Sequence, residues 1–158
     1  MGKAPGSVVF IGKKKMEQSR FRLIQYNQDR CNEVESDNLK QLLKAFDPEC
    51  VNWLNIDGVH DLQAIELVAQ HVGLSPLQTE SIANTDQRPR MLDHNKVMAI
   101  FLKMLRFDPE LVKVSTDQIT FILDGHFLIT FQENVGSLFD PIRERIRTSS
   151  GKLRSSGP

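Results

Sequence analysis

Few side chains in this sequence stand at the spacings that catalysis or cofactor binding requires. It contains no G-x-x-x-x-G-K-[ST] phosphate loop, no G-x-G-x-x-G turn and no G-x-S-x-G nucleophile elbow. Cys31 and Cys50 lie far apart, without the C-x-x-C spacing typical of zinc sites. None of the histidines forms an H-E-x-x-H pair; they are His60, His71, His94 and His126. We therefore expect that the chain is not an enzyme and that these side chains are structural or solvated.

Carboxylates are the remaining side chains that could bind a ligand. Mg²⁺ keeps most of its waters in proteins and needs only one or two carboxylates. The acids near predicted helix starts and turns are Asp57, Asp61, Glu80, Asp86 and Asp93. Asp61 is explained as a helix cap, whereas Glu80 lies inside a predicted helix and is not needed as a cap. From composition alone, a solvated surface acid is the simpler interpretation of Glu80.

Charge is distributed unevenly along the chain. The 158 residues contain 20 Lys and Arg and 20 Asp and Glu, so the formal net charge is zero. Residues 1–30 carry a net +5, residues 31–140 a net −9 and residues 141–158 a net +4. Neutrality is therefore the average of an acidic body between two basic ends. It argues against a simple basic nucleic-acid-binding protein.

Length and composition predict a single soluble domain. Hydrophobic residues make up 40% and charged residues 25%, as in an ordinary globular protein. No window approaches the ~18–20 continuous apolar residues of a membrane span. Met1–Gly12 lacks the apolar run and cleavage site of a signal peptide. Two cysteines make no disulfide framework, so we expect a reducing compartment.

Two groups of basic residues have a second interpretation. Phe21, Arg22, Tyr26 and Arg30 interleave aromatic and basic side chains, as a surface for single-stranded nucleic acid does. The alternation of a strand explains the same pattern more simply. The three arginines within residues 143–147 form a solvated helix face or, as the alternative, contact phosphate or lipid headgroups.

Hydrophobic periodicity predicts the N-terminal elements. Strands are expected at Ser7–Ile11, Arg20–Tyr26 and Val51–Ile56, with a polar loop at Asp29–Ser36. One helical stripe consists of Leu39, Leu42, Leu43 and Phe46. Ser36 or Asp37 is the expected cap of this helix.

Capping signals place two further helices. Asp61 is expected to cap a helix that ends at Gly73. Ser75 and Gln78 have the capping-box spacing, with a proline at the first helical position. A short helix is therefore expected to run to about Asn84.

The C-terminal half predicts three strands. Lys96–Phe107 is ambiguous between a strand and a buried helix, and we favour a strand. Asp124-Gly125 between two apolar runs is a strong hairpin signal. A two-residue turn there would pair Leu123 with His126, Phe121 with Leu128 and Ile119 with Thr130. Both faces of this hairpin are apolar, which implies cover on both sides.

The order of elements predicts the fold class. With a last helix capped by Asp140, the pattern is β-β-α-β-α-α-β-β-β-α. We expect an α/β/α sandwich with a mixed parallel and antiparallel sheet covered by helices on both faces. Residues 1–6 are expected to be a flexible N-terminus, 7–148 the folded domain and 149–158 a flexible basic tail.

Several short motifs follow one another along the chain. They are V-N-W-L-N-I-D-G at 51–58, S-P-L at 75–77 followed by Glu80, Q-R-P at 87–89, K-M at 103–104, F-Q-E at 131–133 and F-D-P-I-R-E-R-I-R at 139–147. In order and spacing, from about Pro5 to Leu153, the chain resembles the cytosolic N-terminal domain of CorA-type magnesium and cobalt transporters. The first and last of these motifs are the most specific.

The resemblance implies a divalent-cation-sensing domain of a homopentameric Mg²⁺/Co²⁺ transporter. In that family a stalk helix, two transmembrane helices and a Gly-Met-Asn signature follow the domain. The chain is then expected to be a soluble fragment that lacks the pore and works at the cytoplasmic face of the cell's inner membrane. Its partners would be other copies and its own transmembrane region, with no nucleic acid and no small organic substrate. The alternatives are the same domain of a ZntB-like zinc transporter and a stand-alone soluble α/β binding domain.

The resemblance also implies one ligand for a cation. In the family, two successive acids on the short helix help to form a site between subunits. Here these positions hold Glu80 and Ser81, so only the first acid is present. We expect Glu80 to contribute to a regulatory site for Mg²⁺, with Co²⁺ or another divalent cation as an alternative, and the isolated domain to bind weakly.

Overall fold

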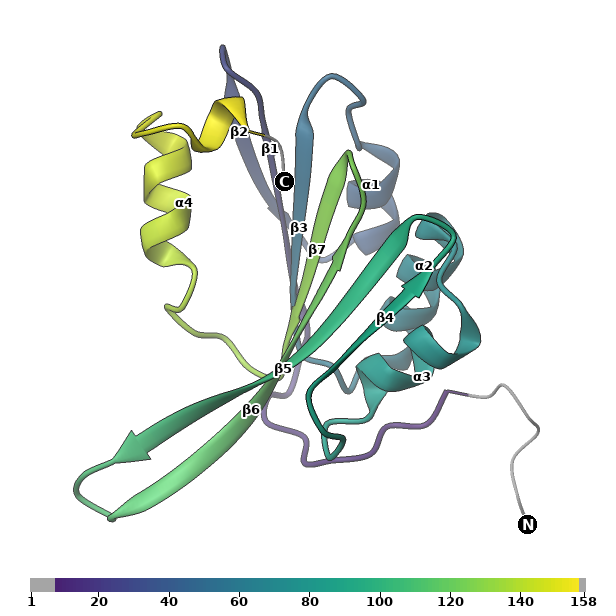
Figure 1. Ribbon diagram of the computed structural model, residues 1–158, viewed down its shortest axis with the longest axis vertical. Coiled ribbons are helices and arrows are strands. Elements are labelled where there is room, and N and C mark those ends of the chain that lie inside the picture. The colour runs from purple at the N-terminus through teal and green to yellow at the C-terminus, as the bar shows by residue number, and fades with distance from the viewer. Residues whose placement is uncertain (1–7, 157–158) are drawn as a thin grey trace.

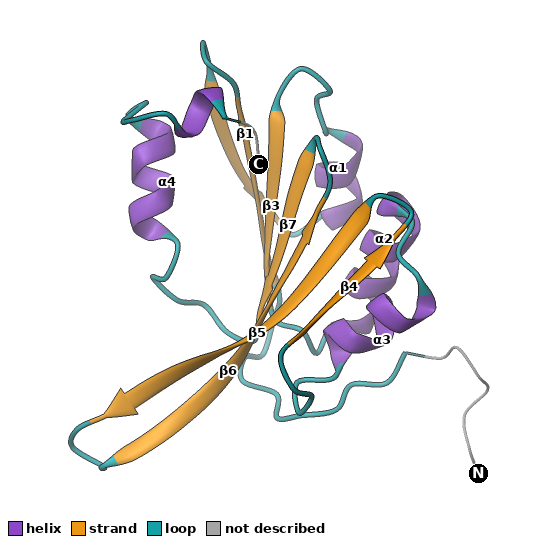
Figure 2. Ribbon diagram, viewed as in Figure 1, coloured by secondary structure: helices purple, strands orange, loops and turns teal. Residues whose placement is uncertain are grey.

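The computed structural model describes residues 8–156, which form one sheet with helices on both of its faces (Figures 1 and 2). The strands are β1 (Arg20–Tyr26), β2 (Cys31–Ser36), β3 (Val51–Asp57), β4 (Arg90–His94), β5 (Val97–Asp108), β6 (Lys113–Leu123) and β7 (Phe127–Gln132). The helices are α1 (Leu39–Lys44), α2 (Leu62–Val72), α3 (Pro76–Ala83), α4 (Asp140–Arg147) and the 3-10 turn η1 (Leu153–Ser155). Within these residues, no helix has the length and apolar character that crossing a bilayer requires. The predicted mixed α/β/α sandwich is confirmed.

The seven strands lie in the order β2-β1-β3-β7-β6-β5-β4. Only β3 and β7 run parallel to each other among these strands; every other neighbouring pair is antiparallel. Parallel neighbours need a long crossover, and here α2, α3 and the β4–β5–β6 meander supply it. The sheet therefore consists of two antiparallel groups joined at β3 and β7.

The two faces of the sheet carry separate apolar clusters. Helices α1, α2 and α3 cover one face, where Leu54, Phe101 and Phe131 are fully buried (Figure 2). Helix α4 and η1 lie on the other face, where Trp53, Phe139 and Ile146 form the second cluster. This division follows from the alternation of side chains along each strand.

The ends of α2 and α3 follow the local signals of the sequence, whereas Asp140, the expected cap of the last helix, is the first residue of α4, and no side chain caps that helix. Asp61 accepts a hydrogen bond from the amide of Ala64, and Gly73 ends α2 with a left-handed φ of 74°. Ser75 and Gln78 form the predicted capping box of α3. For α1 the expected cap is wrong by one or two residues: Asn38 accepts from the amide of Gln41. An amide oxygen at this position satisfies a free helix amide as well as the neighbouring Ser36 or Asp37 would.

Two expectations for the N-terminal half are wrong. Ser7 lies outside the described residues, and Val8–Phe10 form no strand; Ile11 makes a single parallel bridge to Asn84. The predicted polar loop at Asp29–Ser36 contains the edge strand β2. One side of an edge strand faces water, so a polar sequence is compatible with the ladder.

The predicted β6–β7 hairpin forms with a shifted register. Leu123 pairs with Leu128 and Phe121 with Thr130, two residues further along β7 than expected. The carboxylate of Asp124 accepts from the amides of His126 and Phe127, which moves the turn onto residues 125–126. A shift of two residues keeps every side chain on its expected face.

The predicted strand at Lys96–Phe107 is confirmed as β5, while β4 was not expected. Strand β6 begins at Lys113, six residues before the predicted start. Beyond Phe101 and Ile119, strands β5 and β6 pair only with each other. This two-stranded ribbon, residues 102–118, is called the arm, and Figure 1 shows it projecting away from the helices.

Part of the C-terminal tail packs against the domain. Leu153 of η1 contacts the second apolar cluster, and the Arg154 guanidinium donates to the carbonyl oxygens of Ile146 and Arg147. The domain boundaries expected at residues 6 and 148 remain predictions.

An ion pair between Arg147 and Glu33 is expected to hold α4 on the sheet. Arg147 donates two hydrogen bonds to the Glu33 carboxylate, at 2.7 and 2.9 Å. The bond from Arg147 outweighs burial and lowers the pKa of Glu33. This contribution to stability is present above the usual pKa of 4.5 and is lost as the pH falls through the lowered value.

Glu33→Gln should therefore lower the free energy of unfolding by about 0.5–1 kcal/mol at neutral pH, because the pair is partly exposed. The difference from wild type should shrink in urea titrations as the pH is lowered below 4.5 and the Glu33 carboxylate is protonated. A difference independent of pH would contradict this role for the pair.

Candidate functional site

Glu80 lies on the exposed side of α3 and lines a groove between α2 and α3. The groove has a volume of about 300 Å³ and is called the α2–α3 groove. Its lining is Val8, Glu66, Ala69, Gln70, Leu74, Pro76, Thr79 and Glu80. Two exposed carboxylates, Glu66 and Glu80, thus stand beside a partly apolar depression.

The orientation of Glu80 is set by the buried side of α3. Gln78 is fully buried, and its side-chain amide donates to the carbonyl oxygens of Leu92 and Val97 at 3.3 and 3.1 Å. Ile82 is also fully buried in the main core. With these side chains directed at the sheet, the helical spacing directs Glu80 outward.

Ser81 points into the domain and away from the groove. Its side chain is 1% exposed, and its hydroxyl donates to the carbonyl of Leu77 and accepts from the Arg90 guanidinium. The amides of Gln87 and Gln118 donate to its carbonyl oxygen. Position 81 therefore lies inside a hydrogen-bond network, and only Glu80 of the two successive positions reaches the surface.

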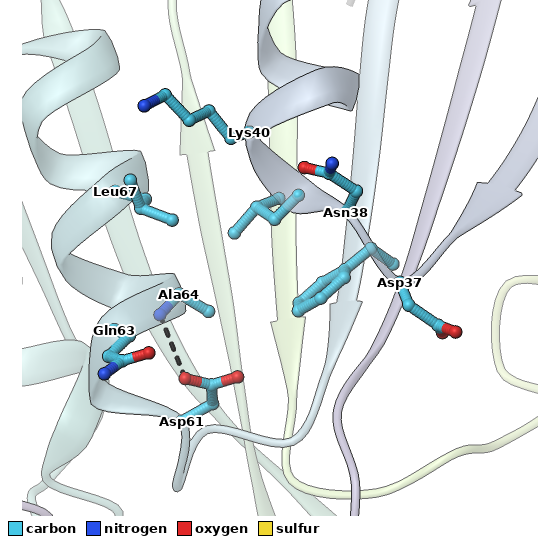
Figure 3. Close-up of a pocket in the computed structure, with 9 residues that line it drawn as sticks. Asp37, Asn38, Lys40, Asp61, Gln63, Ala64 and Leu67 are labelled. Atoms are coloured by element: carbon cyan, nitrogen blue, oxygen red, sulfur yellow. Dashed lines mark hydrogen bonds between the residues drawn. The ribbon is translucent and has the colours of Figure 1, made fainter.

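Asp61 belongs to a second groove, between the starts of α1 and α2 (Figure 3). The figure shows Asp37 and Asp61 on opposite sides of this groove, with the dashed line marking the cap from Asp61 to Ala64. Asp61 therefore acts as the N-cap of α2, as the sequence predicts.

The other acids are scattered. Asp57 ends β3, and burial raises its pKa although Asn55 donates a hydrogen bond to it at 3.1 Å. Asp86 and Asp93 are exposed, in a turn and on β4. Across residues 8–156 the structure brings no three His, Cys, Asp or Glu side chains together as a metal cluster. Any hydrated cation at Glu80 would meet one or two carboxylates from this chain.

A charged cluster that the sequence did not predict lies at the base of the arm. The Lys15 ammonium contacts Asp117 at 2.5 Å and Glu133 at 2.7 Å, and Arg106 contacts Asp117 at 3.3 Å. Glu133 also accepts from the backbone amide of Gln118. Burial alone would lower the pKa of Lys15, but the two carboxylates outweigh it and raise the pKa. We call Lys15, Arg106, Asp117 and Glu133 the clamp; its members are too distant in sequence for local patterns to reveal it.

Within residues 8–156 the cysteine and histidine side chains form no cluster. Cys31 lies on β2, where burial raises the pKa of its thiol, and Cys50 is buried before β3; both are free. His71 packs edge-on against Phe46, with ring centroids 5.3 Å apart. His94 ends β4 and is exposed.

The chain is similar to known transport proteins. Residues 49–157 match the family described as CorA-like Mg²⁺ transporter protein. The cobalt/magnesium transport protein CorA of Thermotoga maritima is 32% identical over 153 residues, which are 97% of this chain and 43% of that protein. The chain thus spans less than half the length of this relative.

Two solved structures share the fold. The full-length CmaX protein superposes with a TM-score of 0.66 at 17% identity, over 88% of this chain and 42% of its own. The complete CorA magnesium transporter of Methanocaldococcus jannaschii has a TM-score of 0.56 at 11% identity, over 85% of this chain and 38% of its own.

The clamp yields a stability prediction. Lys15→Met leaves Asp117 and Glu133, which are 6% and 4% exposed, with Arg106 as their only remaining clamp cation. We expect the free energy of unfolding to fall by about 2 kcal/mol, because a buried charge that loses its partner is costly. Lys14→Met, which breaks only the exposed pair with Glu17, should change it by about 0.5 kcal/mol or less. Equal effects of the two variants on the free energy of unfolding would show that the clamp stabilises the domain no more than the exposed pair does.

Proposed function

The chain belongs to the CorA-like Mg²⁺ transporter family, and on that premise we propose that it is the cytosolic, divalent-cation-sensing domain of a Mg²⁺ and Co²⁺ transporter. The proposal places the domain at the cytoplasmic face of the cell's inner membrane. There it works in a homopentamer, joined to a transmembrane region of the same protein that forms the pore.

The observation that carries this proposal is the position of Glu80. Its carboxylate is exposed, it caps no helix, and it shares the α2–α3 groove with Glu66. Mg²⁺ binds through one or two carboxylates and keeps several waters, so such a shallow acidic surface suits it better than a closed cage. A second subunit would supply the remaining ligands.

Regulation follows from differential affinity. A cation that binds Glu80 more tightly in one arrangement of the subunits stabilises that arrangement by the difference in binding free energy. When the cation concentration falls, the site empties and the other arrangement gains population. The domain thereby links the cation level of the cytosol to the pore without conducting ions itself.

Cation binding to the isolated chain tests the role of Glu80. One exposed carboxylate with Glu66 nearby should bind Mg²⁺ with a Kd of about 1 mM or weaker. In an NMR titration, amide shifts should concentrate on α2 and α3 and disappear in Glu80→Gln. Glu110→Gln, which removes an exposed acid of the arm, is the matched control and should leave the shifts in place. Shifts that survive Glu80→Gln would contradict this assignment.

A transport assay tests the regulatory role directly. The domain can replace the matched part of the Thermotoga maritima relative, and cation uptake can be followed in cells that express this chimera. Glu80→Ala should leave uptake in place and weaken its inhibition by internal Mg²⁺, because the closed arrangement loses a ligand. If uptake and inhibition both stay unchanged, Glu80 has no regulatory role. Reading the gene beyond Pro158 for two apolar segments and Gly-Met-Asn tests the link to a pore.

A further inference from the structure

The Lys15 ammonium lies among oxygen atoms at the base of the arm. Its Nζ atom is 2.5 Å from Asp117 Oδ1, 2.7 Å from Glu133 Oε2 and 3.0 Å from the backbone carbonyl oxygen of Thr116. Thr116 and Asp117 belong to β6, and Glu133 directly follows β7. Both carboxylates are nearly buried. Two segments of the sheet thus hold one cation with three oxygen atoms.

A further oxygen at this place has no partner. Gln132 is 2% exposed, and its Oε1 atom makes no hydrogen bond within the described part of the chain. Gln132 pairs with Ile119, and Asp117 lies two residues before Ile119, so Gln132 and Asp117 project from the same face of the sheet. The side chains of Gln132, Asp117 and Glu133 line the same small space. A buried polar atom without a partner indicates a missing ion or water.

These oxygens are the ligands of a hard cation. Carboxylates, backbone carbonyls and side-chain amides all bind Ca²⁺, which takes about six to eight oxygens at about 2.3–2.6 Å. The two carboxylates offer two oxygens each, and Thr116 and Gln132 add one each. Mg²⁺ keeps several of its waters, and a nearly buried position does not accommodate them. The donor set therefore favours a large hard cation such as Ca²⁺ over Mg²⁺.

Lys15 is the member of the clamp that can leave. Its side chain is 26% exposed, and residues 13–16 form neither helix nor strand. When the ammonium moves into solvent, Asp117 and Glu133 lose their shared cation. The position of Nζ is then surrounded by oxygens at distances close to those of a Ca²⁺ site.

We propose that the base of the arm is a cation site of the Ca²⁺ class, for whose oxygens Lys15 and the metal ion compete. Its ligands are Thr116, Asp117, Gln132 and Glu133. Binding of the ion releases Lys15, and with it the segment that Lys15 ties to the arm. The inference does not depend on the cation site proposed on α3.

Arg106 limits the affinity of this site. Its guanidinium lies 3.3 Å from Asp117 Oδ2 and stays in the clamp when Lys15 leaves. The clamp is neutral with its two basic side chains and carries a net +1 when a divalent ion replaces Lys15. Arg106 is 43% exposed, so solvent screens part of the repulsion. Together with the competition from Lys15, this predicts a Kd for Ca²⁺ of about 1 mM in the wild type.

A calcium titration of the intact 158-residue chain tests the competition. The amide resonances of Gln118 and Glu133 should shift as CaCl₂ is added. The Kd should fall by about tenfold or more in Lys15→Met, because the competing cation is gone. Lys14→Met removes the neighbouring ammonium, which pairs with the exposed Glu17, and should leave the Kd unchanged. If Lys15→Met binds Ca²⁺ no more tightly than the wild type, the proposal is overturned.

Substitution of single ligands tests the donor set in the Lys15→Met background. Gln132→Leu removes an oxygen without changing the charge, and it should fold because that oxygen has no partner to lose. It should raise the Kd by about fivefold, and Asp117→Asn should raise it by more. Circular dichroism establishes that each variant is folded. An unchanged Kd in Gln132→Leu or in Asp117→Asn would contradict this set of ligands.

Stability is a second readout of the same site. Ca²⁺ that binds the folded state should raise the urea midpoint of Lys15→Met toward that of the wild type, and Mg²⁺ at the same concentration should raise it less. Equal effects of the two ions would overturn the assignment to the Ca²⁺ class. Ca²⁺ shifts at Gln118 that disappear in Glu80→Gln would overturn the separate site. Mg²⁺ shifts on α3 that survive Glu80→Gln contradict the proposed function alone.

Discussion

The parallel pairing of β3 with β7 is the constraint on which the rest of the structure depends, because it joins the two antiparallel halves of the sheet. Buried polar side chains fix its register. The Trp53 indole donates to the Thr130 hydroxyl at 3.1 Å, and that hydroxyl donates to the Asn55 side chain at 2.9 Å. A slip of one residue would leave these groups buried without partners, and each unsatisfied group costs about 1–3 kcal/mol.

Each face of the sheet positions a different feature of the domain. On one face Gln78 anchors α3 to the carbonyl oxygens of β4 and β5, and the helical spacing then turns Glu80 to the surface and Ser81 inward. On the other face Arg143 lies between Trp53 and Phe139, 5.5 and 5.8 Å from their rings, and joins α4 to the same central strands. The α4 contact is thus positioned by the middle of the sheet, whereas the acidic groove is positioned through β4 and β5 at one edge.

The arm extends the same sheet beyond its helical cover. One face of the arm is anchored by the clamp, in which Lys15 compensates two buried carboxylates. The other face, with the exposed Leu105, Phe107 and Val114, continues the sheet face of the main core, and no helix of residues 8–156 covers it. The clamp therefore holds one face of the ribbon and leaves the other face exposed. This explains how a chain with an ordinary composition carries an apolar surface at one place and an acidic groove at another.

The sequence by itself determined the elements whose signals are local. Caps such as Asp61, Gly73 and Ser75 act within one helical turn, and the apolar runs favour a strand at β5 and at the part of β6 that begins at Ile119. The edge strands β2 and β4 were not predicted. One side of each strand faces water, so their sequences are polar and typical of loops. Only the tertiary structure decided that Ser81 is buried, that Glu80 lines the groove with Glu66, and that Lys15 meets Asp117. These contacts arise from sheet pairing between distant segments, and local spacing does not encode them.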